Sequence, residues 1–226
     1  MANKTVLICV AHRDDETIGC GGTIYKHHLM GDKVYCVSMT DGVSARTNDT
    51  KEDKLNALKR IKNSKNASKI LKFSWIDHEE TFHDNQLDKS PLLKIIKLIE
   101  KVKNKIKPDI VYTHSNIDLN IDHQIVSRAT LTAFRPLKKE KCSKILLFEI
   151  PSSTDYSLHP FKPNFFNDIT KHWNKKKRAL EAYKEEIINH KSSRSLTGMK
   201  NLALYRGNIS GLNMCEAFLI VREINK

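Results

Sequence analysis

Apolar residues along the chain fall into two patterns, short β-branched runs and longer stretches with helical spacing. The short runs predict buried strands over residues 5–10, 34–39, 72–76, 110–113, 144–149 and 214–223. The stretches between them predict helices over residues 17–29, 52–71, 91–106, 123–134 and 168–190. Residues 152–167 are aromatic and contain two prolines, and we expect them to form a loop that serves as a pocket wall or lid.

Strands that alternate with helices at this spacing predict an α/β fold, a Rossmann-like, doubly wound and mostly parallel sheet flanked by helices. A chain of 226 residues is long enough to bury one core, so residues 1–226 are expected to form a single domain. No G-x-G-x-x-G pattern follows the first predicted strand, which argues against a dinucleotide-binding fold.

Four polar residues follow the first predicted strand: His12, Asp14, Asp15 and Glu16. Open α/β sheets bind their ligands at such carboxyl ends of strands. An imidazole and a carboxylate three residues apart can converge on one divalent cation, which leaves the neighbouring carboxylate free to act as a base. The same residues also fit an ordinary helix N-terminus with Asp14 or Asp15 as its cap.

A second polar cluster, residues 118–123, follows the predicted strand over residues 110–113. A catalytic zinc keeps three protein ligands and an open position for water, so His12 and Asp15 need a third partner. His123 is the best candidate for it. Two clusters in the same position after a strand favour a metal site over a simple helix cap.

Two loops contain candidate substrate contacts. Residues 77–88 are rich in Asp, Glu and His, but their spacing favours substrate contacts or surface polarity over a second metal site. Asn85 is the candidate there for holding a hydroxyl of the substrate. Arg46 lies in a polar loop of small residues, where its guanidinium either reaches an anionic or hydroxyl-rich substrate or is an ordinary surface arginine.

Five segments resemble, in order, the motifs of the LmbE-like (PIG-L-type) zinc-dependent N-deacetylases. Residues 11–16, Ala-His-Arg-Asp-Asp-Glu, resemble the A-H-P-D-D-E signature, and residues 120–123, Asn-Ile-Asp-His, resemble the later H-x-D-H element. Residues 40–46, 84–88 and 215–218 resemble the substrate loop, the D-N-x-L-D element and the A-E-A-F element of that family. The resemblance covers nearly the whole chain and implies the LmbE-like fold.

The resemblance also implies roles for individual residues. His12, Asp15 and His123 are expected to bind zinc, and Asp14 is expected to be the general base. Asp122 is expected to orient an imidazole as a neighbouring carboxylate.

Two positions depart from the family pattern. Arg13 replaces a proline, so the turn is less rigid or the arginine adds positive charge near the substrate. Asn120 replaces the histidine credited with oxyanion stabilisation, and an asparagine can donate a hydrogen bond but supplies neither a proton nor a charge. Either Asn120 fills that role neutrally, or His114 contacts the substrate from the end of its strand. His114 is equally compatible with an ordinary histidine at a strand end.

The chain is basic, with 39 Lys and Arg against 26 Asp and Glu and a net charge of +13. This charge raises a nucleic-acid or anionic-membrane hypothesis. The lysines are spread over the predicted helices, however, and no nucleic-acid-binding motif is present, so a phosphate-bearing small substrate is a more economical use of the charge. The five cysteines are scattered without a C-x-x-C pair, which predicts mostly buried thiols in a reducing compartment.

The first residues carry no signal-peptide pattern, because residues 1–4 lead straight into an apolar run that is too short. No stretch approaches the roughly 18 apolar residues of a membrane span. The expected location is therefore cytoplasmic, and the expected partner is a small N-acetylated sugar or sugar conjugate, without nucleic acid. The sequence leaves the oligomeric state open and is compatible with a homo-oligomer.

These observations predict a cytoplasmic N-deacetylase that binds one Zn²⁺ per chain and acts on an N-acylated amino sugar or a glycan or nucleotide-sugar precursor. Two imidazoles and a carboxylate would also admit iron, cobalt or manganese. Three alternatives stay open: a zinc amidohydrolase of a thiol conjugate or antibiotic-like substrate, a metal-retaining protein without catalysis, and a basic nucleic-acid-binding module.

Overall fold

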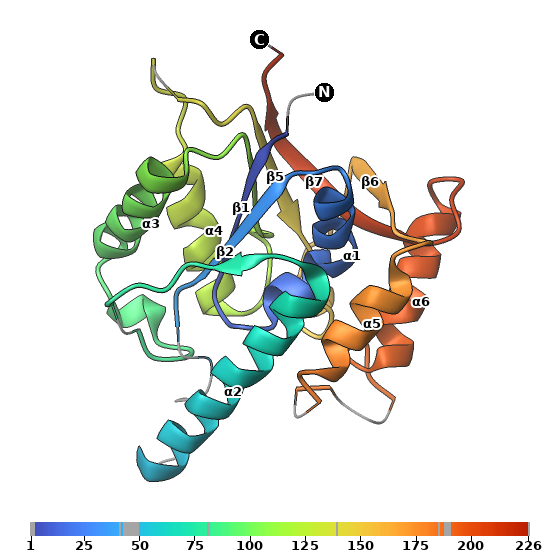
Figure 1. The fold of residues 1–226 in the computed structure, drawn as a ribbon, viewed down its shortest axis with the longest axis horizontal. Coiled ribbons are helices and arrows are strands. Elements are labelled where there is room, and N and C mark those ends of the chain that lie inside the picture. Colours follow the sequence, from blue (N-terminus) through green and yellow to red (C-terminus); the bar gives the residue numbers. More distant parts are fainter. Residues whose placement is uncertain are drawn as a thin grey trace.

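One sheet runs through the middle of the structure, with its strands in the order β3-β2-β1-β4-β5-β7-β6 (Figure 1). The computed structural model of the protein describes residues 3–40, 42, 50–80, 82–138, 140–184, 186–187 and 191–225. The strands are β1 (Thr5–Val10), β2 (Lys33–Ser38), β3 (Ser74–Trp75), β4 (Ile110–His114), β5 (Lys144–Phe148), β6 (Phe165–Asp168) and β7 (Cys215–Glu223). The α-helices are α1 (Asp15–Leu29), α2 (Thr50–Leu71), α3 (Leu92–Ile106), α4 (Ile121–Ala133), α5 (Trp173–Glu181) and α6 (Leu196–Asn208).

Strands β1 to β5 run parallel, and β7 is antiparallel to both β5 and β6. The chain winds outward from β1 through β2 to β3, then returns past β1 and continues through β4 and β5. The order therefore reverses between β1 and β4, and the carboxyl ends of these two strands define the crevice where open α/β sheets bind ligands. The predicted doubly wound, mostly parallel sheet is confirmed.

Helices cover both faces of the sheet (Figure 1). Helices α1, α2 and α5 pack together on one face, and α3 packs against α4 on the other. Val6, Ile8 and Val10 of β1 belong to the core beneath α1, whereas Leu7 and Cys9 belong to the core beneath α3 and α4. Burial on both faces explains why β1 is a continuous apolar run without alternation.

Helix α1 is interrupted at Cys20, whose backbone angles (φ −145°, ψ 24°) are not helical. At such a break the N–H groups of the following turn lose their carbonyl partners. Those of Gly22 and Thr23 donate instead to the carboxylate of Glu216 in β7, at 2.9 and 2.7 Å. Glu216 therefore caps the second part of α1 from a strand that lies 194 residues away from Gly22 in sequence.

Lys176 of α5 completes this junction. Its Nζ donates to the Glu216 carboxylate and to the carbonyl oxygen of Ile18, both at 2.7 Å. Lys176 and Glu216 are each only 5% exposed. The pair gives the A-E-A-F-like element a structural role, because it fixes the first part of α1 and with it the residues that follow β1.

The region beyond residue 150 differs from the prediction. Residues 165–168 form β6 instead of a loop, because they pair with β7 at the edge of the sheet. The predicted helix over residues 168–190 is wrong in its bounds, since α5 begins at Trp173 and ends at Glu181. The sequence pattern does not predict α6, because Gly198 and Gly207 lower its helix propensity. Elsewhere the predicted elements are confirmed, with shifted ends such as the start of α1 at Asp15.

All five cysteines are buried and free, as their scattered spacing predicts. Burial raises the pKa of the Cys9 thiol to about 12, so this thiol is not ionised near neutral pH. Among the described residues, the structure has no helix that is both long and apolar enough to cross a membrane.

Candidate active site

The candidate site lies where β1 and β4 end, between the first turns of α1 and α4. His12 and Asp14 belong to the turn after β1, and Asp15 is the first residue of α1. His123 lies in the first turn of α4, whose N-cap is Asn120. The Asn120 side-chain oxygen accepts the backbone N–H of His123 at 3.3 Å, so the asparagine starts the helix that presents this imidazole.

Three buried side chains direct ligand atoms at one point. The Nδ1 atom of His12 lies 3.2 Å from Nε2 of His123 and 3.2 Å from Oδ2 of Asp15. The Nε2 atom of His123 lies 3.5 Å from Oδ1 of Asp15. Ligand atoms around a tetrahedral zinc, with bonds of about 2.0–2.1 Å, lie about 3.3 Å apart. The structure therefore brings the three predicted ligands together at separations that suit such an ion.

The Asp15 carboxylate has too few hydrogen-bond donors. Its Oδ2 accepts the backbone N–H of His12 at 2.8 Å, whereas its buried Oδ1 has no hydrogen-bond partner in the described chain. Burial alone would raise the pKa of Asp15, but the imidazoles of His123, His114 and His12 outweigh burial and hold this pKa well below its usual range. A buried carboxylate oxygen without a donor is costly. These residues therefore fit a divalent cation, which would pair with that oxygen.

Two carboxylates orient the ring of His12. Its Nε2 lies 3.0 Å from Oδ1 of Asp84 and 3.4 Å from Oδ2 of Asp122. These contacts hold the ring with Nδ1 facing Asp15. His12, Asp84 and Asp122 also lie within ligand distance of one another and form a second group that could hold a metal ion. Sequence reasoning did not select Asp84, although it opens the D-N-x-L-D-like element.

Asp118 orients the second imidazole, and sequence reasoning did not assign it this role. Its Oδ1 lies 3.1 Å from Nδ1 of His123, which turns Nε2 towards Asp15. The hydroxyls of Ser153 and Thr154 donate to the same carboxylate, the second of them at 2.6 Å. Because these hydroxyls come from the loop after β5, no local sequence pattern reveals the network.

Asp14 occupies the N-cap position of α1, yet its side chain makes no capping hydrogen bond. The carboxylate is buried, with Oδ2 3.1 Å from Nη1 of Arg60 and 2.7 Å from Nη2 of Arg194. Its Oδ1 has no hydrogen-bond partner in the described chain. The arginines thus hold Asp14 beside the candidate ligands with one oxygen able to take a proton. Arg194 lies 180 residues away in sequence, so local patterns do not connect it with Asp14.

A cavity of about 410 Å³ opens onto this cluster, a volume that suits a small-molecule ligand. On its wall, Nδ2 of Asn120 donates to Oδ1 of Asn85 at 3.0 Å. Asn85 and Ser152 are non-glycine residues with φ of 52° and 65°, a strained conformation that is concentrated at functional sites. The lining residues are His12, Asp14, Gly42, Arg60, Asp84, Asn85, Leu119, Asn120, His123, Ser152, Ser153 and Arg194.

His114, predicted as a substrate contact, does not line the cavity. It is fully buried and stacks on His123, with ring centroids 4.0 Å apart and an interplanar angle of 10°. Its Nε2 accepts the backbone N–H of Ala11 at 3.0 Å. Burial, together with the nearby His123, lowers its pKa to about 4, so the ring is neutral near pH 7. This geometry makes His114 a support for His123 and not a substrate contact.

Arg13 points away from the cavity. Its guanidinium lies 4.6 Å from the centroid of the Trp75 ring and donates to Asp77 at 2.6 Å. The arginine that replaces the family's proline therefore packs against β3, and it brings no charge to the cavity wall. Arg46, the other predicted substrate contact, lies outside the described residues.

The structure is thus an open α/β sheet. Two imidazoles and several carboxylates lie where the strand order reverses, between β1 and β4. Residues 7–134 match the PIG-L family, described as GlcNAc-PI de-N-acetylase. The chain belongs to this family. The matched segment includes both His12 and His123.

The similarity to known proteins extends over most of the chain. The diacetylchitobiose deacetylase of Thermococcus kodakarensis is 28% identical over 230 residues, 98% of this chain and 84% of that protein. Among solved structures, the N,N'-diacetylchitobiose deacetylase from Pyrococcus horikoshii, in complex with its inhibitor, has a TM-score of 0.78 at 24% identity and covers 97% of this chain and 84% of its own.

A second similar structure belongs to a protein named for a different activity. GalB, the 4-carboxy-2-hydroxymuconate hydratase from Pseudomonas putida KT2440, has a TM-score of 0.78 at 20% identity, covering 99% of this chain and 98% of its own. At these identities the structural matches establish the fold alone. The hydratase also shows that the fold serves more than one reaction, so the reaction must be argued from the site.

Proposed function

We propose that the protein is a zinc-dependent hydrolase that removes an N-acetyl or other short N-acyl group from an amino sugar or a related glycan precursor. The observation that carries this proposal is the convergence of His12 Nδ1, His123 Nε2 and the Asp15 carboxylate, with the Asp14 carboxylate beside them. Membership of the PIG-L family and similarity to a diacetylchitobiose deacetylase support the choice of an N-acetylated sugar.

The donor set favours zinc. Two imidazole nitrogens and one carboxylate, beside a cavity, are the ligands of a catalytic zinc that keeps one position open. A bound zinc ion would supply a water molecule with a pKa near 7 and would polarise the substrate carbonyl. Iron, cobalt or manganese would accept the same ligands, so the metal present in the cell depends on availability.

Asp14 is the base in this mechanism. Its unpartnered Oδ1 accepts a proton from the attacking water as the new C–O bond forms at the amide carbon. The same carboxyl then donates that proton to the amine nitrogen as the C–N bond breaks, which releases the free amino sugar and a carboxylate such as acetate. Arg60 and Arg194 hold the carboxylate in position before the reaction.

The cavity wall favours a polyhydroxylated substrate. Asn85, Asn120 and Ser152 present amide and hydroxyl groups to the cavity, and Leu119 adds an apolar surface at its edge. Neutral hydrogen-bonding side chains of this kind suit the hydroxyls of a sugar ring. The basic surface of the protein would still admit a phosphate elsewhere on the substrate.

The experiment combines metal analysis with primary-amine release from a panel of N-acetylated free, phosphorylated and nucleotide-linked sugars. We expect about one zinc per chain, turnover on at least one sugar, loss of turnover with retained metal in Asp14→Ala, and loss of metal in His123→Ala. Metal without amine release from any N-acetylated sugar would leave a different substrate or an inactive binder. Absence of metal after reconstitution would overturn the proposal.

A further inference from the structure

Arg194 has hydrogen-bond donors that the described part of the chain does not use. Its guanidinium lines the cavity, its side chain is 20% exposed, and its Nη2 donates to Asp14 at 2.7 Å. A guanidinium carries five N–H donors. Within the described chain, this guanidinium makes no hydrogen bond other than the one to Asp14.

Arg60, the other arginine of the cavity, is fully engaged. It is 4% exposed, and its two terminal nitrogens contact Asp14, Glu186 and the backbone oxygens of Arg13 and Gly42. It therefore has a structural role in holding the turn after β1, and its donors are not free for a ligand. No lysine lines the cavity among the described residues.

Hydrolysis of an amide places a negative charge on the former carbonyl oxygen, and donors directed at that oxygen are among the largest contributions to catalysis. Asn120 offers at most a neutral donor, because its oxygen caps α4 and its nitrogen already donates to Asn85. His114 is fully buried and absent from the cavity wall. Arg194 is thus the remaining cationic side chain in the cavity with free donors, within the part of the chain that the structure describes.

We propose that Arg194 is a catalytic residue that donates a charge-assisted hydrogen bond to the oxyanion. This inference rests on the proposed amide hydrolysis. Its contact with Asp14 couples the two charges of the reaction. As the C–O bond forms, the carbonyl electron pair moves to oxygen and the proton of the attacking water moves to Asp14. The carboxylate loses its charge at the step where the oxyanion gains one, so the guanidinium exchanges one anionic partner for another.

The test separates stabilisation of the oxyanion from binding of the substrate. Arg194→Gln and Arg194→Lys are compared with the wild type, and Arg135→Gln, which removes a half-exposed arginine of a distant surface, is the matched control. For Arg194→Gln we expect kcat to fall about 100- to 1,000-fold, with KM nearly unchanged and zinc content retained. Arg194→Lys should keep part of the rate, and the control should match the wild type.

A binding measurement gives a readout that does not depend on turnover. The methylphosphonamidate of glucosamine mimics the anionic tetrahedral state, and glucosamine, which has the sugar ring but no oxygen at the oxyanion position, is the comparison. Arg194→Gln should weaken the phosphonamidate by a factor similar to the fall in kcat and leave glucosamine affinity unchanged. Guanidinium ion added to Arg194→Gly should restore part of the rate.

Each contrary outcome has its own meaning. A raised KM with unchanged kcat, or equal weakening of both ligands, would make Arg194 a substrate-binding residue and overturn the inference. Full activity in Arg194→Gln would overturn it while leaving the proposed function intact. Wild-type protein that releases no amine would overturn the proposed function, and the inference with it.

Discussion

Asp118 connects the imidazole of His123 with two hydroxyls of the loop after β5, and this small network sets which ring nitrogen faces Asp15. Replacement of Asp118 by asparagine places an amide where the ring needs an anionic acceptor. We expect Asp118→Asn to weaken zinc binding about 10- to 100-fold, as loss of a carboxylate behind a metal-bound histidine does.

Chelator competition on the folded protein measures this change. Asp155→Asn, which removes an exposed carboxylate near the same loop, is the control and should bind zinc like the wild type. Equal zinc affinity in Asp118→Asn and the control would show that the ring is oriented without Asp118.

Glu16 predicts a pH dependence of stability. Burial raises the pKa of its carboxyl from 4.5 to about 8, and its Oε2 has no hydrogen-bond partner in the described chain. Between these pH values the folded protein keeps a proton that the unfolded chain has lost. Stability therefore falls as pH rises through this window, by at most about 1.4 kcal/mol per pH unit.

Glu16→Gln isolates this contribution, because glutamine stays neutral and can still accept the hydroxyls of Thr17 and Tyr183. Urea unfolding at pH 5 and pH 8 is the measurement. Wild type and variant should be similar at pH 5, and the variant should be the more stable at pH 8. Parallel loss of stability in both proteins would contradict the raised pKa of Glu16.

The chemistry of the site is unequally visible in the sequence. His12, Asp14 and Asp15 fall within one turn, and His123 follows an apolar strand, so local spacing reveals the cluster. The groups that orient these residues come from distant segments. Asp118 accepts a hydrogen bond from a hydroxyl of the loop after β5, and Arg194 contacts Asp14 across 180 residues of sequence. Contacts of this kind become apparent only when the topology brings distant loops together.

At the scale of elements, the break in α1 depends on one buried ion pair. Lys176→Met leaves the Glu216 carboxylate buried without its cation, and we expect a loss of about 3–5 kcal/mol in the free energy of unfolding. The double variant Lys176→Met, Glu216→Gln should lose less than the sum of the single changes. Denaturant unfolding measures all three.

Lys177→Ala is the control, because Lys177 and Glu181 form an ion pair that is about half exposed, at 3.8 Å. An exposed i,i+4 pair contributes only about 0.3–0.5 kcal/mol. Losses of similar size in Lys176→Met and Lys177→Ala would show that the junction in α1 does not depend on the buried pair.

Elements were predictable where burial on both faces or a clear helical stripe marks them. β1 and β4 are buried at nearly every position, and α3 buries one row of residues against the sheet. β6 and α6 lack such marks, because β6 is a half-buried edge strand and α6 contains two glycines. Their positions follow from pairing with β7 and packing at that edge, which no local pattern encodes.

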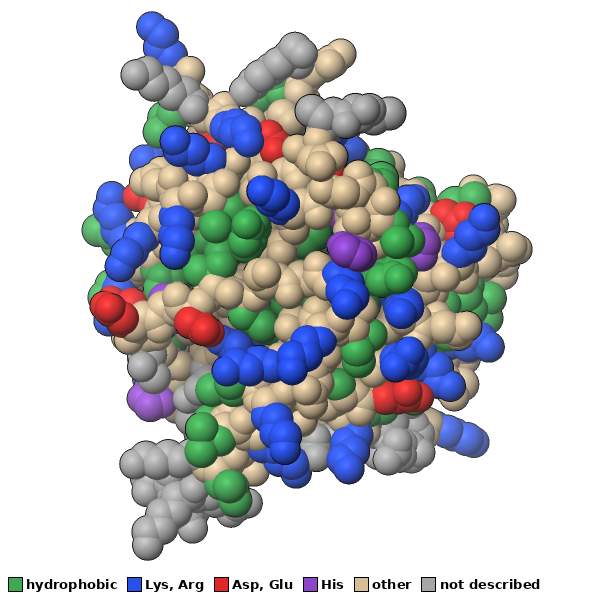
Figure 2. Space-filling model, viewed as in Figure 1, with side chains coloured by type: hydrophobic (Ala, Val, Ile, Leu, Met, Phe, Trp, Pro, Cys, Tyr) green, Lys and Arg blue, Asp and Glu red, His purple; other side chains and the backbone are tan. Residues whose placement is uncertain are grey.

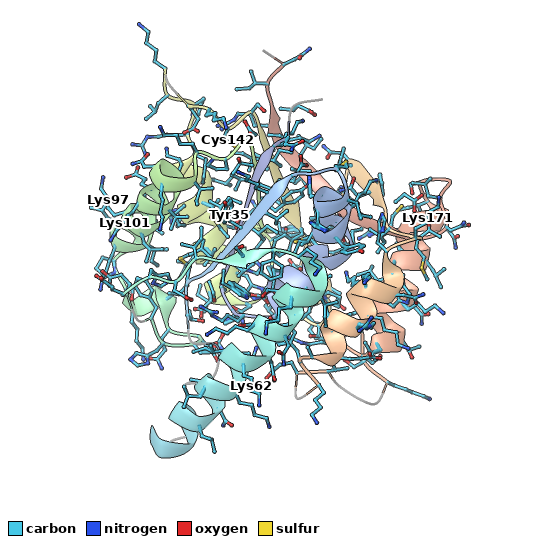
Figure 3. All side chains as sticks on the ribbon, viewed as in Figure 1. Tyr35, Lys62, Lys97, Lys101, Cys142 and Lys171 are labelled. Atoms are coloured by element: carbon cyan, nitrogen blue, oxygen red, sulfur yellow. The ribbon has the colours of Figure 1, made fainter. Side chains whose placement is uncertain are left out.

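At the scale of the whole molecule, the face drawn in Figure 2 carries positive charge that is distributed and not gathered. Figure 2 shows Lys and Arg side chains spread over the visible face among polar and apolar groups. Figure 3 shows the exposed Lys62 on α2 and the exposed Lys97 and Lys101 on α3 far apart from Lys171. A net charge of +13 produces a general attraction for anions.

This distribution predicts a salt effect that depends on the substrate. For N-acetylglucosamine 1-phosphate, kcat/KM should fall as ionic strength rises, because screening shortens the range of attraction to about 10 Å at 0.1 M salt. For neutral N-acetylglucosamine, kcat/KM should stay nearly constant. Steady-state rates across a sodium chloride series measure both, and equal salt responses would show that the surface charge does not guide the substrate.

The capped break in α1 also has a consequence for synthesis of the chain. The ribosome delivers His12, Asp14 and Asp15 first, but the acceptor for the N–H groups of Gly22 and Thr23 arrives only with Glu216. Until β7 is added to the sheet, the helix that begins at Asp15 has no cap at its break. The signature residues are therefore translated long before the residue that caps this break, and a nascent chain stalled before residue 216 holds the signature motif without that cap.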